Sequence, residues 1–295
     1  MVCNCVRVRN FRNIAEAEVE FCSEVNILAG ANAQGKTNLL EAIGYVALGK
    51  SFRTVHDEDM IRFGEECAEL SVDFTDSQRR QNLTVRMMPG RRRRIEQNHV
   101  KVGRVSEIVG QFRTVLFCPE HLSLVKDGPG ERRNFLDVAL SQLYPVYLKR
   151  LQRYNQILRQ RNQLIRSATD DPKTFRETAE FWSCQLAAEA AAISRYRYRY
   201  LCEAGREIAA CFREMTGERE TPGVAYAGSS KQPPEEYEDE EATLRVYTRL
   251  LTANWEREIA AGSTLWGIHK DDVEILLNGK PARAFASQGQ QRSLA

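Results

Sequence analysis

Gly30-Ala31-Asn32-Ala33-Gln34-Gly35-Lys36-Thr37 is the stretch of sequence that decides the fold. It fits G-x-x-x-x-G-K-[ST], the P-loop pattern, at every constrained position. The run before it, residues 25–29, is short and mostly apolar, which predicts a buried strand. After it, apolar residues recur at helical spacing from Leu39 to Ala47 until Gly49 ends the pattern, which predicts a helix. Strand, glycine loop and helix in this order predict a nucleotide site.

Each constrained residue of this loop has a chemical purpose. Gly30 and Gly35 let main-chain N–H groups turn inward around phosphates, where a side chain would clash. Lys36 reaches the β- and γ-phosphates, and the hydroxyl of Thr37 ligates Mg²⁺. The following helix directs its positive N-terminal end at the anion. We therefore expect a magnesium–nucleotide complex on residues 30–37, with Thr37 as the metal ligand.

The composition is that of an ordinary globular protein. Of the 295 residues, 42% are apolar and 28% are charged, which excludes a disordered chain. No apolar run reaches the about eighteen residues that a membrane span needs, and the N-terminus does not look like a signal peptide. We expect no membrane partner and a cytoplasmic location. The eight cysteines are scattered, which favours reduced thiols over a disulfide scaffold or a metal site at Cys3 and Cys5.

The charges are segregated along the chain, although 42 basic and 40 acidic residues nearly cancel. Residues 76–113 contain ten basic and three acidic residues, residues 149–166 contain six basic residues and no acidic ones, and acidic residues cluster at 235–241. Segregated basic stretches favour contact with a phosphate backbone, independently of base sequence and sensitive to salt. On charge alone, Arg91, Arg92, Arg93 and Arg94 are the predicted DNA contacts. The alternative is a solvated hairpin tip.

The pattern of apolar residues predicts an α/β chain with a helical middle. Strands are predicted at residues 15–21, 72–74, 83–87, 95–102 and 114–117. Long helices are predicted over 131–216 with a break at 170–172, followed by a loop or linker at 216–241 and a helix over 242–261. Residues 273–277, the Asn278-Gly279 turn and a short second strand predict a hairpin. The predicted domains are 1–127, an ATPase lobe with the P-loop; 128–262, a helical second domain; and 263–295, the start of a C-terminal ATPase lobe.

A second segment supports the nucleotide site. Ser287, Gln288, Gly289 and Gln290 follow this hairpin and precede an incipient helix. They resemble the signature loop of ABC-type ATPases, a superfamily in which this loop caps the γ-phosphate held by a second protomer. Alone, such a turn is common, but together with the P-loop it favours an ABC-type ATPase.

Segments along the whole chain resemble the RecF family of bacterial recombination mediators. The similar segments are residues 10–13, 30–43, 50–54, 118–122, 132–137, 269–272 and 285–293, and the P-loop with its Asn38-Leu39-Leu40-Glu41-Ala42 continuation is among the most specific. This resemblance implies an SMC-like ABC ATPase head, with a P-loop lobe and an inserted, mostly helical second domain.

The resemblance also implies function. It implies ATP and Mg²⁺ as cofactors, ATP-dependent homodimerisation, binding to single- and double-stranded DNA, and cooperation with RecR and RecO to load RecA at gapped DNA. By position, Arg12 and Asn13 touch the nucleotide held by Gly30, Ala31, Asn32, Ala33, Gln34, Gly35, Lys36, Thr37 and Asn38, and residues 287–290 contact the partner's ATP.

One expected feature is missing from the sequence. ABC ATPases need four apolar residues followed by Asp-Glu, two carboxylates that hold Mg²⁺ and supply the general base. No such run occurs here. The chain also ends at Ala295 inside an incipient helix. We therefore expect an N-terminal fragment with poor or absent hydrolysis, and catalytic residues are left unassigned.

Two other functions fit parts of the sequence. One is another ABC-lineage ATPase head, such as an overcoming-lysogenization-type nuclease, which a carboxylate-rich domain beyond residue 295 would favour. The other is a small-molecule P-loop kinase, which is disfavoured because no lid-like substrate motif appears.

Two smaller signals favour structural roles. His269, Asp271 and Asp272 fit an acid–base or metal cluster less well than a hydrogen-bonding role. Residues 195–200 alternate Arg and Tyr, but on a helix they would spread round the whole circumference. This favours packing, with the arginines extended to solvent, over a stacking platform for single-stranded DNA.

Overall fold

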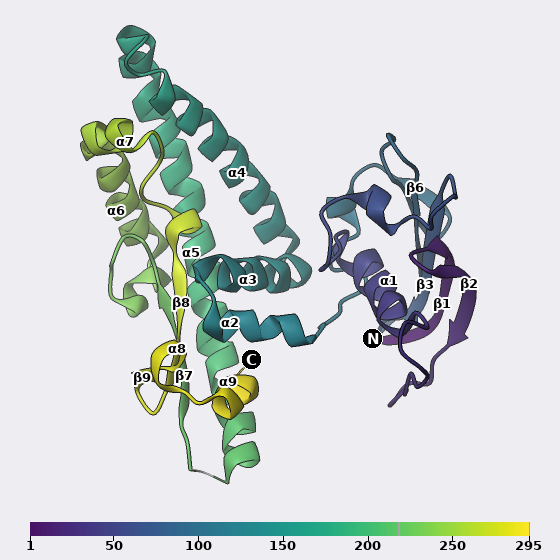
Figure 1. Cartoon of the computed structure of the whole chain (residues 1–295). Coiled ribbons are helices and arrows are strands. Elements are labelled where there is room, and N and C mark those ends of the chain that lie inside the picture. Colours follow the sequence, from purple (N-terminus) through teal and green to yellow (C-terminus); the bar gives the residue numbers. More distant parts are fainter. Residues whose placement is uncertain (218, 295) are drawn as a thin grey trace. The chain divides into compact units, whose positions relative to one another are not determined.

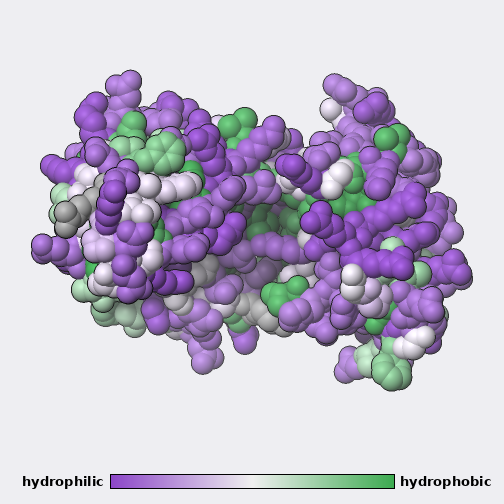
Figure 2. All heavy atoms as spheres, turned by 90° about the horizontal axis from the view of Figure 1, so that it is seen from above, coloured by the Kyte–Doolittle hydropathy of each residue, from purple (hydrophilic) through white to green (hydrophobic). Residues whose placement is uncertain are grey.

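The computed structural model describes residues 1–217 and 219–294. The chain forms two compact units, Met1–Leu116 and Phe117–Ala295 (Figure 1). The division into domains at 127/128 and 262/263 stays a prediction. No helix in the described part of the chain is both long enough and apolar enough to cross a membrane. On the face shown in Figure 2, hydrophilic residues predominate over both units, and hydrophobic residues gather only in small patches.

The first unit is built on a six-stranded antiparallel sheet with the order β2-β1-β3-β4-β5-β6. The register pairs Val6 with Val19 on one side and with Val72 on the other, and Val72 with Leu83. Alternating residues therefore share one face across neighbouring strands. The strands are β1 (Val2–Phe11), β2 (Ile14–Glu20), β3 (Ala68–Thr75), β4 (Arg80–Met87), β5 (Arg94–Gln97) and β6 (Val100–Val102).

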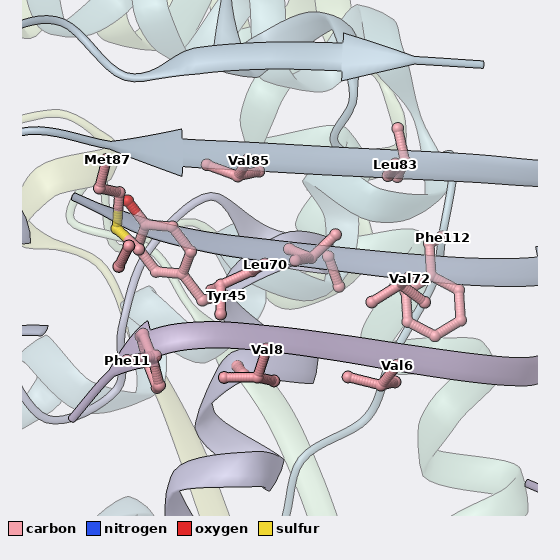
Figure 3. Close-up of a cluster of buried hydrophobic side chains, with 14 of the residues drawn as sticks. Val6, Val8, Phe11, Tyr45, Leu70, Val72, Leu83, Val85, Met87 and Phe112 are labelled. Atoms are coloured by element: carbon pink, nitrogen blue, oxygen red, sulfur yellow. The ribbon is translucent and has the colours of Figure 1, made fainter. Parts of the chain in front are cut away.

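One face of this sheet is the core of the unit. Figure 3 shows apolar side chains of β1, β3 and β4 beside Tyr45, which comes from helix α1 (Lys36–Leu48). Val6, Val72 and Leu83 are almost fully buried. The opposite face is polar, and Arg7 on β1 bridges Glu18 and Asp73 there at 2.8 and 2.9 Å. The apolar face thus fixes α1, and with it the loop before α1, against the sheet.

Helix α1 ends where the sequence predicts. Gly49 adopts a left-handed φ of 67° and donates its N–H to Tyr45 O, a conformation that glycine adopts without strain. A Cβ at this position would lie 2.1 Å from Cγ1 of Val105, in the short 3-10 helix η2 (Val105–Glu107). A second 3-10 helix, η1 (Asp57–Met60), follows the loop after α1.

Two predicted strands of this unit are wrong. Residues 25–29 form no strand, and Val25 and Ile27 are 80% and 84% exposed. The Asn26 side chain instead bonds both main-chain groups of Cys22, and such local bonds compete with strand pairing. Residues 114–117 form no strand either, and Val115 is exposed. Both runs are apolar, but a strand also needs a neighbour, and no strand among residues 1–217 and 219–294 pairs with them.

The other predicted strands of the unit are confirmed, with one correction. β3 and β4 cover the predicted strands, and β2 covers the predicted strand 15–21 except Phe21. Residues 95–102 form two strands, β5 and β6, instead of one. Asn98 and His99 adopt left-handed φ values of 51° and 65° and turn the chain between them. Asn tolerates this conformation better than most residues.

The second unit is mostly helical, and helix α5 is its longest element (Figure 1). A proline lies in the first turn of α3, α4 and α5, and Asp171 caps α5 by accepting the N–H of Thr174, as expected for helix starts. The helices are α2 (Ser123–Lys126), α3 (Pro129–Leu143), α4 (Pro145–Arg166), α5 (Pro172–Thr216), α6 (Glu240–Ala253), α7 (Trp255–Ala261), α8 (Ala282–Phe285) and α9 (Gln288–Leu294), with the 3-10 turns η3 (Pro119–Leu122), η4 (Pro234–Glu238) and η5 (Ile268–Lys270).

A small antiparallel sheet of order β7-β8-β9 completes this unit. The strands are β7 (Pro222–Ala227), β8 (Asp272–Leu277) and β9 (Lys280–Pro281). The predicted hairpin at Asn278-Gly279 is confirmed, with φ values of 52° and 74° at the two turn residues. The loop predicted over 216–241 is wrong in part, because β7 and η4 lie within it. β7 reads Pro-Gly-Val-Ala-Tyr-Ala, and it is a strand because β8 pairs along its length.

The helix predicted over 242–261 is interrupted at Asn254, between α6 and α7. Nδ2 of Asn254 donates to Leu250 O at 2.9 Å. An asparagine side chain that bonds nearby main chain favours a helix end over a helix interior. The alternating run at 195–200 packs as predicted, but the expectation that its arginines extend to solvent is wrong for Arg197, which bonds Asp137 and Ile268 O. Arg197 is almost fully buried, while Tyr196 and Tyr198 lie against the core.

Candidate functional site

The glycine loop lies directly before α1. Gly30, Ala33 and Gly35 have φ values of 151°, 64° and 93°, and Gly35 is the N-cap of the helix. These left-handed residues curl the main chain at the helix N-terminus, where the first N–H groups lack intrahelical partners. The helix macrodipole adds partial positive charge there. The exposed Gly30, the half-buried Gly35 and the positive end of the helix fit a phosphate chain.

Lys36 and Thr37 lie in the first turn of α1. The ammonium of Lys36 donates to Gly30 O at 2.8 Å and to Ala31 O at 2.7 Å, so it lies against the loop main chain. Thr37 is exposed, as its predicted role as an oxygen ligand for Mg²⁺ requires. Both side chains fit the chemistry predicted for them.

Arg12 and Asn13 form the turn between β1 and β2, next to the loop. Asn13 Nδ2 donates to Ala33 O at 2.7 Å, and its Oδ1 accepts from Asn38 Nδ2 at 2.7 Å. Arg12 donates through Nε and Nη2 to the Glu41 carboxylate, at 3.1 and 2.6 Å. The structure therefore brings Arg12, Asn13 and Asn38 together with the P-loop, and their polar groups support the loop and helix α1.

Glu41 is the centre of this support, and prediction from the sequence gave it no role. Its side chain is fully buried on α1, where it accepts from Arg12, from Arg53 at 3.1 Å and from Ser51 at 2.6 Å. Burial alone would raise the pKa of Glu41. The hydrogen bonds from Arg12 and Ser51 and the charges of Arg12 and Arg53 outweigh it, so the pKa is lowered. The sequence signal that could have indicated this role is a glutamate on the apolar face of the predicted helix.

The signature segment lies in the second unit, at the start of α9. The Ser287 hydroxyl accepts the N–H of Gln290 at 3.3 Å, and Gln290 Oε1 accepts the N–H of Ser287 at 2.7 Å. This reciprocal pair is a capping box, which explains the Ser-x-x-Gln spacing structurally. Ser287, Gln288 and Gly289 are exposed, and Gln290 Nε2 also bonds Glu220. The P-loop therefore belongs to the first unit, and the predicted signature loop belongs to the second.

The four predicted DNA contacts differ in their surroundings. Arg91 and Arg92 are exposed at the β4–β5 turn, and neither forms an ion pair within the described residues. Arg93 instead donates to Gly49 O at 2.5 Å, pairs with Asp57 at 3.0 Å and lies over the ring of Tyr45. Arg94 pairs with Glu96 at 2.8 Å. Two of the four guanidiniums are thus available to a phosphate backbone, and Arg93 holds the hairpin to the end of α1.

The residues His269, Asp271 and Asp272 have structural partners. His269 accepts from the Tyr154 hydroxyl at Nδ1 and donates from Nε2 to Thr264 O. Burial lowers the pKa of His269 to about 4, so the imidazole is neutral at pH 7. Asp271 is buried with Tyr226 and Ser229, and its pKa is raised by burial. Asp272 pairs with Arg132 at 2.7 Å. Within residues 1–217 and 219–294, no group of three or more His, Cys, Asp or Glu side chains is placed to hold a metal ion.

The loop, the sheet and the helices have the fold of a P-loop ATPase head of the SMC-like type. Residues 5–110 match the AAA domain family. The head domain of an Smc protein from Pyrococcus furiosus shares the fold, with a TM-score of 0.53 at 15% identity over 99% of this chain and 76% of that chain.

A particular family then follows from the curated relatives. The "DNA replication and repair protein RecF" of Staphylococcus carnosus is 37% identical over 295 residues, which cover 100% of this chain and 79% of the relative. A solved structure of the recombination mediator protein RecF-ATPrS in the RecFOR pathway is 31% identical, with a TM-score of 0.91 over 99% of this chain and 78% of that chain. The chain belongs to the RecF family of DNA replication and repair proteins.

Proposed function

We propose that this protein is an ATP-controlled DNA-binding protein of replication and recombinational repair. It binds Mg-ATP, dimerises on ATP, binds single- and double-stranded DNA at gaps without reading base sequence, and promotes RecA loading with RecR and RecO. It acts in the cytoplasm and serves the SOS response. The observation that carries this proposal is the P-loop at the N-terminus of α1 in a chain of the RecF family.

Nucleotide binding rests on the first unit. We assign the triphosphate to Gly30, Ala31, Asn32, Ala33, Gln34, Gly35, Lys36, Thr37 and Asn38, with Arg12 and Asn13 beside them and Mg²⁺ on Thr37. Lys36 donates to two neutral carbonyls, and anionic phosphate oxygens are stronger acceptors than carbonyls. Exchanging these acceptors for phosphate oxygens therefore favours ATP. A solved relative is described as RecF-ATP in the RecFOR pathway, which supports this assignment.

Dimerisation and DNA binding rest on exposed polar groups. Ser287, Gln288, Gly289 and Gln290 contact the nucleotide of the partner copy, and three of these four residues are exposed. Arg91 and Arg92 supply DNA phosphate contacts, and Arg93 and Arg94, which have ion-pair partners within the protein, add positive charge nearby. In this proposal ATP acts as a dimerisation switch, and its hydrolysis is slow.

Membership of the RecF family weighs against the alternatives. The curated relatives are described as DNA replication and repair proteins, and this description fits neither an overcoming-lysogenization-type nuclease nor a small-molecule kinase.

The test measures Mg-ATP affinity by calorimetry, and DNA association by fluorescence anisotropy on a gapped duplex with and without Mg-ATP. Lys36→Ala should weaken ATP binding by at least about tenfold, because it removes charge-assisted bonds to phosphate. It should also abolish the ATP-dependent part of DNA association. Lys173→Ala, at an exposed position of α5, is the matched control. ATP-dependent DNA association that survives Lys36→Ala would refute the proposal.

A further inference from the structure

A chain of three hydrogen bonds connects Arg53 to the main chain of the P-loop. Arg53 Nη1 donates to Asn38 Oδ1 at 2.8 Å, Asn38 Nδ2 donates to Asn13 Oδ1 at 2.7 Å, and Asn13 Nδ2 donates to Ala33 O at 2.7 Å. The four residues come from the loop after α1, the first turn of α1, the β1–β2 turn and the P-loop. Four segments of the first unit thus meet in one line of contacts.

The direction of this chain is fixed at both ends. A guanidinium has only donors, so the amide of Asn38 must present its oxygen to Arg53 and its nitrogen to Asn13. Asn13 must then accept from Asn38 and present its own nitrogen to Ala33. The carbonyl of Ala33 can only accept, so the far end requires the same direction. Arg53 and Ala33 together leave each of the two amides one orientation.

At Ala33, the end of this hydrogen-bond chain fixes one peptide of the P-loop. Ala33 has a left-handed φ of 64°, which costs free energy in a residue with a Cβ and persists only where neighbouring groups support it. In a trans peptide the C=O and the next N–H point in opposite directions. Holding Ala33 O on Asn13 therefore directs the N–H of Gln34 away from Asn13. Asn13 also packs closely, because a Cβ on Gly35 would lie 3.1 Å from its Oδ1.

Arg53, the first donor of this hydrogen-bond chain, is itself held in place by other contacts. Its Nη1 also donates to the buried Glu41 at 3.1 Å, and its main-chain N–H donates to Ser51 Oγ at 2.9 Å. Ser51 in turn donates to Glu41 at 2.6 Å. The guanidinium is therefore placed by contacts within the protein, although half of the side chain is exposed.

We propose that Arg53 is a positioning residue that acts through Asn38 and Asn13 to keep the N–H of Gln34 directed toward the nucleotide phosphates. This role rests on the proposed binding of ATP at the P-loop. Without the donor at Arg53, only the bond to Ala33 O still holds the two amides in this direction. Asn38 Oδ1 then has no donor, so the amides reverse more readily, and on reversal the carbonyl of Ala33 loses its partner and the peptide between Ala33 and Gln34 is free to turn. A carbonyl turned toward the phosphates would repel them, so affinity for ATP falls.

A double-mutant cycle tests this route, with the Kd of Mg-ATP measured by calorimetry and the melting temperature measured as a check of folding. Arg53→Met and Asn38→Leu should each weaken ATP binding by about three- to tenfold, the value of one net hydrogen bond. Because both act on the same chain, the double variant should be no weaker than the worse single variant. Arg53→Lys, which keeps a donor and a positive charge, should restore most of the affinity.

The outcomes separate the two proposals. Arg79→Met removes an exposed arginine of the same unit and controls for the loss of one charge. If wild type and this control do not bind ATP, the proposed function itself fails. If they bind but the effects of Arg53→Met and Asn38→Leu multiply, or if neither variant has an effect, only the positioning role of Arg53 is overturned.

Discussion

At the scale of single residues, Glu41 shows how one buried carboxylate organises the candidate site. It joins Arg12 of the β1–β2 turn and Arg53 of the loop after α1 to the helix that follows the P-loop. A buried ion pair is costly to break, because removing one partner leaves an uncompensated charge. Here two guanidiniums and the Ser51 hydroxyl share the carboxylate, so the loss of Glu41 affects all three segments.

The first prediction concerns Glu41 and pH. Its pKa in the folded protein is lower than its ordinary 4.5, so its ionised form stabilises the fold fully above about pH 4.5. This contribution is lost as the pH falls through the lower folded pKa. Glu41→Gln should cost about 3 kcal/mol at pH 7, and the difference from wild type should shrink by pH 4. Calorimetric unfolding at several pH values measures it, and a difference that stays constant with pH would contradict the prediction.

The sequence allows some of these residues to be predicted, but not others. The P-loop is contiguous, so its pattern alone places Lys36 and Thr37. Arg12 is 29 positions from Glu41 and Arg53 is 12 positions from it, and no local pattern relates the three. Only the fold brings them together, so the buried carboxylate and the role of Arg53 needed the structure.

At the scale of elements, prediction succeeded where local pattern and local bonding agree. The alternation over 15–21 becomes β2, and the apolar recurrence after the P-loop becomes α1. It failed at residues 25–29, where Asn26 bonds its own main chain at Cys22. It also failed at β7, because the strand depends on pairing with β8, about fifty residues further along the chain. Pairing is a property of two segments, and a single segment does not contain it.

The second prediction concerns the packing of α4 against α7. Arg161 and Glu258 are fully buried and 2.6 Å apart, and the guanidinium lies 4.5 Å from the ring centroid of Trp255. Arg161→Met should destabilise the second unit by about 3–5 kcal/mol, since Glu258 stays buried without its partner. Adding Glu258→Leu should recover most of the loss. Urea unfolding followed by tryptophan fluorescence suits this unit, because Trp182, Trp255 and Trp266 all lie in it. A double variant as unstable as the single one would contradict this account.

At the scale of the whole molecule, a nearly neutral chain still carries a segregated charge. The excess of basic residues over 76–113 becomes the sheet edge and the β4–β5 hairpin of the first unit. The structure then divides the arginines of that hairpin, which the sequence cannot do. Arg93 is used internally with Gly49 and Asp57, whereas Arg91 and Arg92 face solvent.

The third prediction follows from this division and from the proposed DNA binding. The double variant Arg91→Ala/Arg92→Ala should weaken DNA binding equally on all base sequences. It should also reduce the slope of log affinity against log salt by about 2, about 1 for each lost phosphate contact. Anisotropy titrations at several salt concentrations measure both effects. Arg245→Ala/Arg249→Ala, at exposed positions of α6, is the charge-matched control. An unchanged slope would exclude these residues from the interface, and Arg93→Ala should mainly lower the melting temperature.

The end of α1 also constrains how this sequence can evolve. Any residue other than glycine at position 49 would meet Val105 at 2.1 Å while adopting a left-handed φ. The branched side chain of Val105 has little rotamer freedom with which to move aside. A smaller residue at position 105 removes this clash, whereas a larger residue at position 49 beside Val105 creates it. The order in which these two positions change therefore matters as much as the residues that replace them.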